Sequence, residues 1–148
     1  MNPKPIAILM AEDDEDDCFL FKEAMAEAQL YNPIYFVADG VELLQYLRRE
    51  PPFDDPKKNP YPGLVILDLN MPRMDGREAL DKIKTDPALK SIPVVVMTTS
   101  REEEDLIRSY KYGANSFITK PIEFAGLVNA IRGFGEYWFS IVKLPPTY

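Results

Sequence analysis

The chain has 148 residues, with 17 basic and 24 acidic side chains and a net charge of −7. It contains no histidine and one cysteine, which excludes Ser-His triads, Cys-His dyads, disulfides within the chain and the usual zinc sites. The length favours one domain, and the acidic balance argues against a nucleic-acid partner. The chain shows neither an apolar run long enough to cross a membrane nor a signal peptide. We therefore expect a cytoplasmic protein that makes no contact with a membrane.

Short apolar runs alternate with helical patterns along the chain. The runs are nearly continuous, which is typical of parallel strands that are covered on both faces. In chain order, we predict a strand at 6–11, a helix at 15–30, a strand at 34–38, a helix at about 40–49, a strand at 64–67, a helix at about 76–86, a strand at 94–97, a helix at 100–111, a strand at 116–118 and a helix from 124. This order predicts an α/β protein, with a doubly wound, five-stranded parallel sheet in a single domain.

Two segments interrupt or extend this pattern. Residues 51–63 form a proline-rich connection that is long for its place, and they predict either a plain surface loop or a contact for a partner. Residues 136–148 follow the predicted domain of residues 1–135 and include Tyr137, Trp138 and Phe139. These aromatic side chains are too apolar for a free tail. They either cover their own domain or contact a second copy of the chain in a homodimer.

Polar side chains stand where the predicted strands end. Glu12 and Asp13 follow the first strand, Asp68 ends the third, Thr98 ends the fourth and Lys120 follows the fifth. Because the carboxyl ends of parallel strands share one edge, these residues are expected to lie together at the edge where such folds bind ligands. Taken singly, each could be a strand end or a surface charge. Their joint placement favours a functional site.

The chemistry of these residues indicates phosphoryl transfer. Glu12, Asp13 and Asp68 would form an all-oxygen site, which suits Mg²⁺. Lys120 would supply a mobile positive charge and Thr98 a hydroxyl donor. A carboxylate nucleophile with a metal, a lysine and a hydroxyl describes a reaction through an aspartyl phosphate.

The sequence resembles the receiver domain of two-component response regulators, which have a flavodoxin-like (βα)5 fold. The resemblance covers about residues 5–135. The matching segments are ILMAEDD (8–14), ILDLNMPRMDG (66–76), PVVVMTTS (93–100) and GANSFITKP (113–121).

This resemblance implies a role for each matching acid. Asp68 would be the phosphoacceptor, and Asp13 would bind Mg²⁺ directly. Glu12 would act on the metal directly or through water, and the backbone carbonyl of Asn70 would be a further ligand.

The resemblance also implies how a signal would leave the site. Thr98 would contact the phosphoryl group and Lys120 would bridge to it. Phe117 matches the aromatic switch position of the family, although it lacks the hydroxyl of a tyrosine there. Tyr110 and Tyr112 lie at the end of the predicted fourth helix, on the side through which many receivers bind partners. They either line the surface or core of that helix or contact a partner.

We therefore predict a stand-alone response regulator and not an enzyme, one that is phosphorylated by a histidine kinase. Its proline-rich loop and its ending are similar to those of small response regulators paired with bacterial and cyanobacterial phytochromes, which suggests a phytochrome-type kinase. Two alternatives fit the sequence less well. A Mg²⁺-dependent aspartyl-phosphate phosphohydrolase conflicts with the order of the acids, and a phosphorylation-independent interaction module conflicts with the complete set of site residues.

Overall fold

The computed structural model describes residues 6–69, 71, 73–74, 76–98, 116–119 and 123–135. Its strands are β1 (Ile8–Ala11), β2 (Ile34–Val37), β3 (Leu64–Asp68), β4 (Val94–Thr98) and β5 (Ser116–Thr119). Its helices are α1 (Glu15–Glu27), α2 (Gly40–Leu47), α3 (Gly76–Thr85) and α5 (Phe124–Gly135). The predicted helix at 100–111 lies outside the described residues. In the part of the chain that is described, no helix has both the length and the apolar character needed to cross a membrane.

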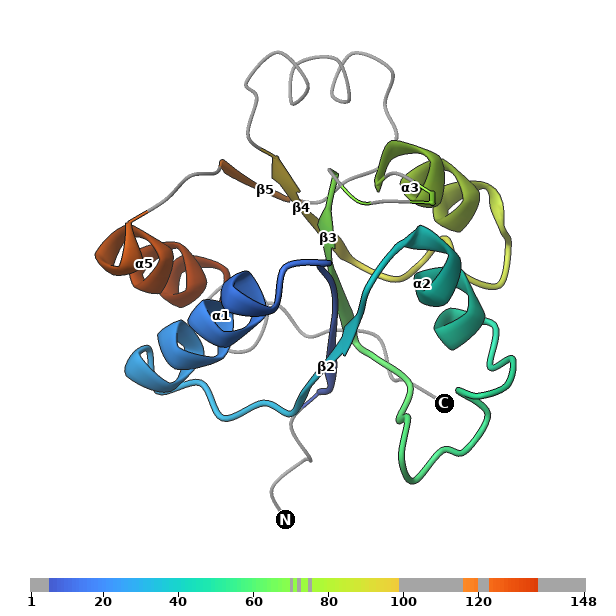
Figure 1. The fold of residues 1–148 in the computed structure, drawn as a ribbon, viewed down its shortest axis with the longest axis horizontal. Helices are drawn as coiled ribbons and strands as arrows, with labels where there is room; N and C mark the ends of the chain where they lie inside the picture. Colours follow the sequence, from blue (N-terminus) through green and yellow to red (C-terminus); the bar gives the residue numbers. More distant parts are fainter. Residues whose placement is uncertain are drawn as a thin grey trace.

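The strands form one parallel sheet in the order β2-β1-β3-β4-β5. Helices α1 and α5 pack together on one face, and α2 and α3 pack on the other (Figure 1). The predicted α/β fold with a doubly wound parallel sheet is confirmed. The pairing within this sheet decides which strand ends are neighbours at its carboxyl edge.

The core is divided by the sheet into two layers. Leu9, Val65 and Val96 point to the side of α2 and α3, whereas their neighbours Met10 and Ile66 point to the side of α1 and α5. Side chains alternate between the faces of a strand, so a strand covered on both faces must be apolar at every position. This explains the near-continuous apolar runs of the sequence.

The proline-rich loop at 51–63 is attached to its own domain by aromatic side chains. The Tyr46 hydroxyl of α2 donates a hydrogen bond to the Pro60 carbonyl at 2.9 Å, and its ring lies 5.3 Å from the ring of Phe53. The guanidinium of Arg49 lies 5.0 Å from the centre of the Tyr61 ring. Burial raises the pKa of the Tyr46 hydroxyl to about 12. These contacts favour the plain reading of this segment, as a loop that covers one end of the core.

Candidate functional site

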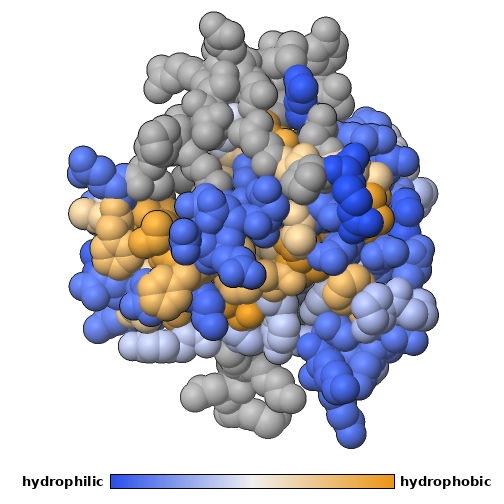
Figure 2. Space-filling model, in the orientation of Figure 1, coloured by the Kyte–Doolittle hydropathy of each residue, from blue (hydrophilic) through white to orange (hydrophobic). Residues whose placement is uncertain are grey.

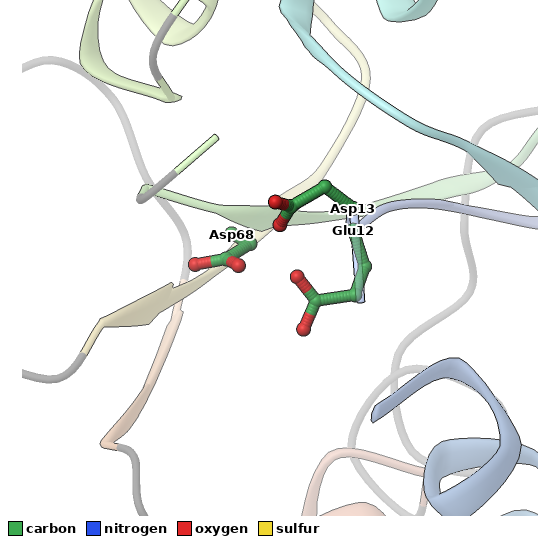
Figure 3. A group of neighbouring side chains, drawn as sticks. All are labelled: Glu12, Asp13 and Asp68. Atoms are coloured by element: carbon green, nitrogen blue, oxygen red, sulfur yellow. The ribbon is translucent and has the colours of Figure 1, made fainter. Parts of the chain in front are cut away.

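Three carboxylates meet at the carboxyl edge of the sheet. Ligand atoms of Glu12, Asp13 and Asp68 all lie within 4.8 Å of one another, and Figure 3 shows the three side chains converging. Glu12 and Asp68 are each 3% exposed, whereas Asp13 is open to solvent. We call these three residues the acidic cluster.

Strand register explains why the acidic cluster forms. Ala11 at the end of β1 pairs with Leu67 of β3, so the residues that follow them, Glu12 and Asp68, emerge side by side. Neither acid could reach the other without this pairing, because 56 positions of chain separate them. The acidic cluster is therefore a product of the parallel sheet, as the sequence predicted.

The next acid, Asp14, has a structural role in helix α1. It is the N-cap of α1, and its side chain accepts hydrogen bonds from the backbone N–H groups of Asp16 at 2.8 Å and Asp17 at 3.2 Å. Capping occupies this carboxylate with donors that the first turn of a helix otherwise leaves without partners. Asp14 therefore stabilises the first turn of α1, whereas Glu12 and Asp13 belong to the acidic cluster.

The acidic cluster has the donor chemistry of a divalent cation site. Three carboxylates provide hard oxygen ligands, and their mutual repulsion falls when a cation lies between them. One exposed member leaves a side open for water or a phosphoryl oxygen. The residues present therefore fit a hard divalent ion, with Glu12, Asp13 and Asp68 as the side chains that would hold it.

Of the remaining predicted site residues, the structure describes Thr98 and the strand position of Phe117. Thr98 is fully buried at the end of β4, one position beyond Met97, which pairs with Asp68. The register therefore places Thr98 at the same edge as the acidic cluster. Phe117 lies on β5, paired with Val96, and nothing further is described for its side chain. The other predicted residues lie outside the described residues: Asn70, Tyr110, Tyr112, Lys120, Tyr137, Trp138 and Phe139.

A hydrogen bond closes the loop that leads from Asp68 to α3. The Gly76 N–H donates to the Leu69 carbonyl at 3.0 Å, and the Leu69 N–H donates to the Met97 carbonyl at 3.0 Å. A Cβ on Gly76 would lie 2.5 Å from the Leu69 Cα and 2.6 Å from the Asp68 carbonyl oxygen. Only glycine fits there without moving the backbone of the predicted phosphoacceptor.

The structure adds a pair of residues that the sequence did not reveal. Asp39, 5% exposed, caps α2 and also accepts a hydrogen bond from Arg73 Nε at 2.6 Å. Burial raises the pKa of Asp39, but Arg73 and the backbone N–H of Glu42 outweigh this effect and hold that pKa below its ordinary value. The sequence Asp39-Gly40-Val41-Glu42 could have indicated the cap. Nothing in the sequence indicated Arg73, because it is 34 positions away.

The fold and the acidic cluster define a class of protein. Residues 8–132 match the family described as the response regulator receiver domain, and the chain belongs to this family. It is accordingly a response regulator of two-component signalling, a class of signalling proteins rather than of classical enzymes.

Particular members of the class are similar over nearly the whole chain. Response regulator Rcp1 of Synechocystis sp. is 37% identical over 144 residues, which are 97% of this chain and 95% of Rcp1. The crystal structure of the phosphorylated cyanobacterial phytochrome response regulator RcpA has a TM-score of 0.84 and 39% identity, over 96% of this chain and 99% of that one. The Mn²⁺-bound form of Rcp1 has a TM-score of 0.81 and 36% identity, over 96% of this chain and all of that one.

Proposed function

We propose that the protein accepts a phosphoryl group on Asp68 from a histidine kinase, in a Mg²⁺-dependent reaction, and signals through contacts with other proteins. The observation that carries this proposal is the convergence of Glu12, Asp13 and Asp68 within 4.8 Å at the carboxyl edge of the sheet. Two similar structures, one of a phosphorylated response regulator and one bound to Mn²⁺, support both parts of it.

The reaction needs one bond to form and one to break. A carboxylate oxygen of Asp68 attacks the phosphorus atom, the new O–P bond forms, and the N–P bond to the donor imidazole breaks. The leaving imidazole takes its proton from solvent. A bound Mg²⁺ would neutralise charge on the phosphoryl oxygens and on the acids. Glu12 and Asp13 would hold that ion beside Asp68, and the Asn70 carbonyl would be a further ligand.

Other residues stabilise and transmit the phosphorylated state. Thr98 donates its hydroxyl to the phosphoryl group, and Lys120 contributes a positive charge. Movement of Thr98 is coupled to packing of Phe117, and the change is read by a protein partner. We place the chain in the cytoplasm, and we propose residues 136–148 as a contact with a second copy of the chain.

The kinase is proposed to be of the phytochrome type. This rests on the similarity to the phytochrome response regulator RcpA and to RPA3017, whose structure is described as acting in red light signalling of R. palustris. Because the chain has no histidine, the phosphohistidine must come from another protein.

The surface beside the site suits contact with such a donor. Figure 2 shows hydrophobic side chains gathered over α1 and α5, and exposed members of these helices include Phe19 (63%), Leu20 and Phe124. Both helices begin at the carboxyl edge of the sheet, so we propose that a protein bringing phosphohistidine to Asp68 contacts this apolar surface. We expect Phe19→Ala to slow transfer from a phosphorylated kinase and to leave labelling by acetyl phosphate unchanged, because the small donor needs no such surface.

Phosphorylation itself is tested with acetyl phosphate and with a phosphorylated histidine kinase, each with and without Mg²⁺. The wild-type chain should gain one base-labile phosphoryl group only with Mg²⁺, and Asp68→Asn should gain none. Asp86→Asn removes a carboxylate on the far side of the domain and should label normally. Label retained by Asp68→Asn contradicts the assignment. Multiple turnover of a phosphomonoester would indicate a phosphohydrolase instead, and an absence of Mg²⁺-dependent labelling would indicate an interaction module.

A further inference from the structure

The loop that follows Asp68 is tied to the start of α2 at two adjacent points. The Arg73 Nε donates to the Asp39 carboxylate at 2.6 Å, and the Gly40 N–H donates to the Met74 carbonyl at 3.2 Å. A Cβ on Gly40 would lie 2.6 Å from the Met74 carbonyl oxygen, so the two backbones are in close contact. One loop of the site is therefore docked on a neighbouring helix.

Asp39 is a fixed point for this contact. Its other carboxylate oxygen accepts the Glu42 N–H at 2.9 Å, while the Glu42 side chain accepts the Ala38 N–H at 2.8 Å. This reciprocal arrangement holds the first turn of α2. A carboxylate that is 5% exposed and bonded on both oxygens has little freedom to follow a moving loop. The position of Asp39 therefore fixes where the loop can bind it.

The backbone of Arg73 takes an unusual conformation. Its φ is 63°, in the left-handed region that costs energy for a residue with a side chain. Its side chain is 58% exposed and does not belong to the core, so core packing does not account for its place. The described contacts at this part of the loop are the bond of Arg73 to Asp39 and the neighbouring hydrogen bond from the Gly40 N–H to the Met74 carbonyl. Met74 is partly buried against the core of α2 and α3.

The same loop is fixed to the site at its two ends. Asp68 precedes it, and the turn that begins at Leu69 is closed by the hydrogen bond from Gly76. Displacing the loop at Arg73 therefore acts on the segment that connects Asp68 with the start of α3. We propose that Arg73 is a positioning residue, which sets the phosphoacceptor loop for Mg²⁺ binding and phosphorylation by anchoring it to Asp39. This inference rests on the proposed function.

The experiment compares the wild-type chain with Arg73→Gln, Arg73→Lys, Asp39→Asn and the double variant Arg73→Gln/Asp39→Asn. Isothermal titration calorimetry gives the Mg²⁺ dissociation constant, and labelling by acetyl phosphate gives the dependence of the rate on Mg²⁺. We expect Arg73→Gln and Asp39→Asn each to weaken Mg²⁺ binding by about tenfold, as for other residues that orient ligands. The rate should recover at saturating Mg²⁺. Arg73→Lys should recover part of the affinity, and the double variant should lose no more than either single one.

Arg48→Gln is the matched control. It removes the ion pair of Arg48 with Asp86, at 3.8 Å, from the opposite end of the same helix, and Mg²⁺ binding should not change. Melting temperatures identify any variant that loses affinity by unfolding, and Arg73 is exposed enough to replace. Unchanged Mg²⁺ affinity in Arg73→Gln, beside a wild-type chain that binds and is labelled, overturns this inference alone. Losses that simply add in the double variant also overturn it. A wild-type chain that neither binds Mg²⁺ nor takes the label overturns the proposed function as well.

Discussion

Asp39 and the acidic cluster both lie at the carboxyl edge of one sheet, and their described neighbours differ. Asp39 lies 2.6 Å from the guanidinium of Arg73, so the chain itself supplies its counter-charge, and its pKa is lowered. The acidic cluster instead gathers three carboxylates within 4.8 Å. A carboxylate held by an arginine fixes structure, whereas carboxylates brought together favour a cation from solution. Burial is similar for Asp39, Glu12 and Asp68. The two places therefore differ in their described neighbours, which are an arginine beside Asp39 and two further carboxylates in the acidic cluster.

The largest expected effect tests the cation at the acidic cluster. At a free Mg²⁺ concentration 100 times the dissociation constant, binding should add about 2.7 kcal/mol to the free energy of unfolding. This corresponds to a rise in melting temperature of roughly 5–10 °C for a chain of this size. Asp13→Asn should lose most of this rise, and Asp86→Asn should keep it. An equal rise in Asp13→Asn, measured by calorimetry, would show that the ion binds elsewhere.

A smaller effect is expected at Gly76, where only a residue without a Cβ fits against the backbone of Asp68 and Leu69. Gly76→Ala places a methyl group against the Asp68 carbonyl and should lower the free energy of unfolding by about 1–3 kcal/mol. On Gly133 of α5, by contrast, a Cβ would meet no described atom within 4 Å, and Gly133→Ala should raise stability by about 0.5–1 kcal/mol. Urea denaturation of both variants checks the contrast. Equal effects would mean that the turn after Asp68 can shift without cost.

The cap at Asp39 gives an intermediate effect. Asp39→Asn keeps an acceptor for the Glu42 N–H, whereas Asp39→Ala removes it, so the alanine variant should be less stable than the asparagine variant by about 1 kcal/mol. Chemical denaturation at neutral pH measures the difference. Equal stabilities would show that the cap contributes nothing and that only the charge of Asp39 matters.

A pH series measures the charge of Asp39 separately. Its pKa is lower in the folded state than in the unfolded chain, where it is about 3.9. The stability gained from the carboxylate is therefore fully present above about pH 4 and is lost as the pH falls through the lowered value. The difference in stability between wild type and Asp39→Asn should be constant from pH 5 to 7 and should shrink below about pH 4. A difference that grows on acidification would contradict this linkage.

The smallest effect is expected at the other ion pair of α2. Arg48 lies 3.8 Å from Asp86, and the two side chains are 44% and 27% exposed. Exposed pairs of this kind contribute little, so Arg48→Gln should change stability by less than about 0.5 kcal/mol, and high salt should erase the difference. A larger loss would show that the Arg48–Asp86 pair at the C-terminal end of α2 contributes as much to stability as the Asp39 cap at its start.

Much of the sheet could be predicted because its signals are local. Apolar runs at 64–67 and 94–97 are explained by burial on both faces, and the observed strands differ from them by one residue, since Asp68 and Thr98 are themselves in the strands. The acids of the cluster were found because Glu12 and Asp13 come immediately after one such run and Asp68 ends another. Helix α1 ends at Glu27 rather than near 30, because Gln29 takes a φ of 59° and turns the chain toward β2. No apolar pattern reports a reversal of this kind.

The sequence by itself determined the elements, their order and the acids at the strand ends, since these depend on residue type and on spacing within a few positions. Contacts between distant residues depend on the tertiary structure. Register between β1 and β3 joins Glu12 to Asp68, and the docking of the loop on α2 joins Arg73 to Asp39. The first of these could be anticipated, because parallel strands end together. The second could not, because an ion pair between two irregular segments leaves no periodic trace in the chain.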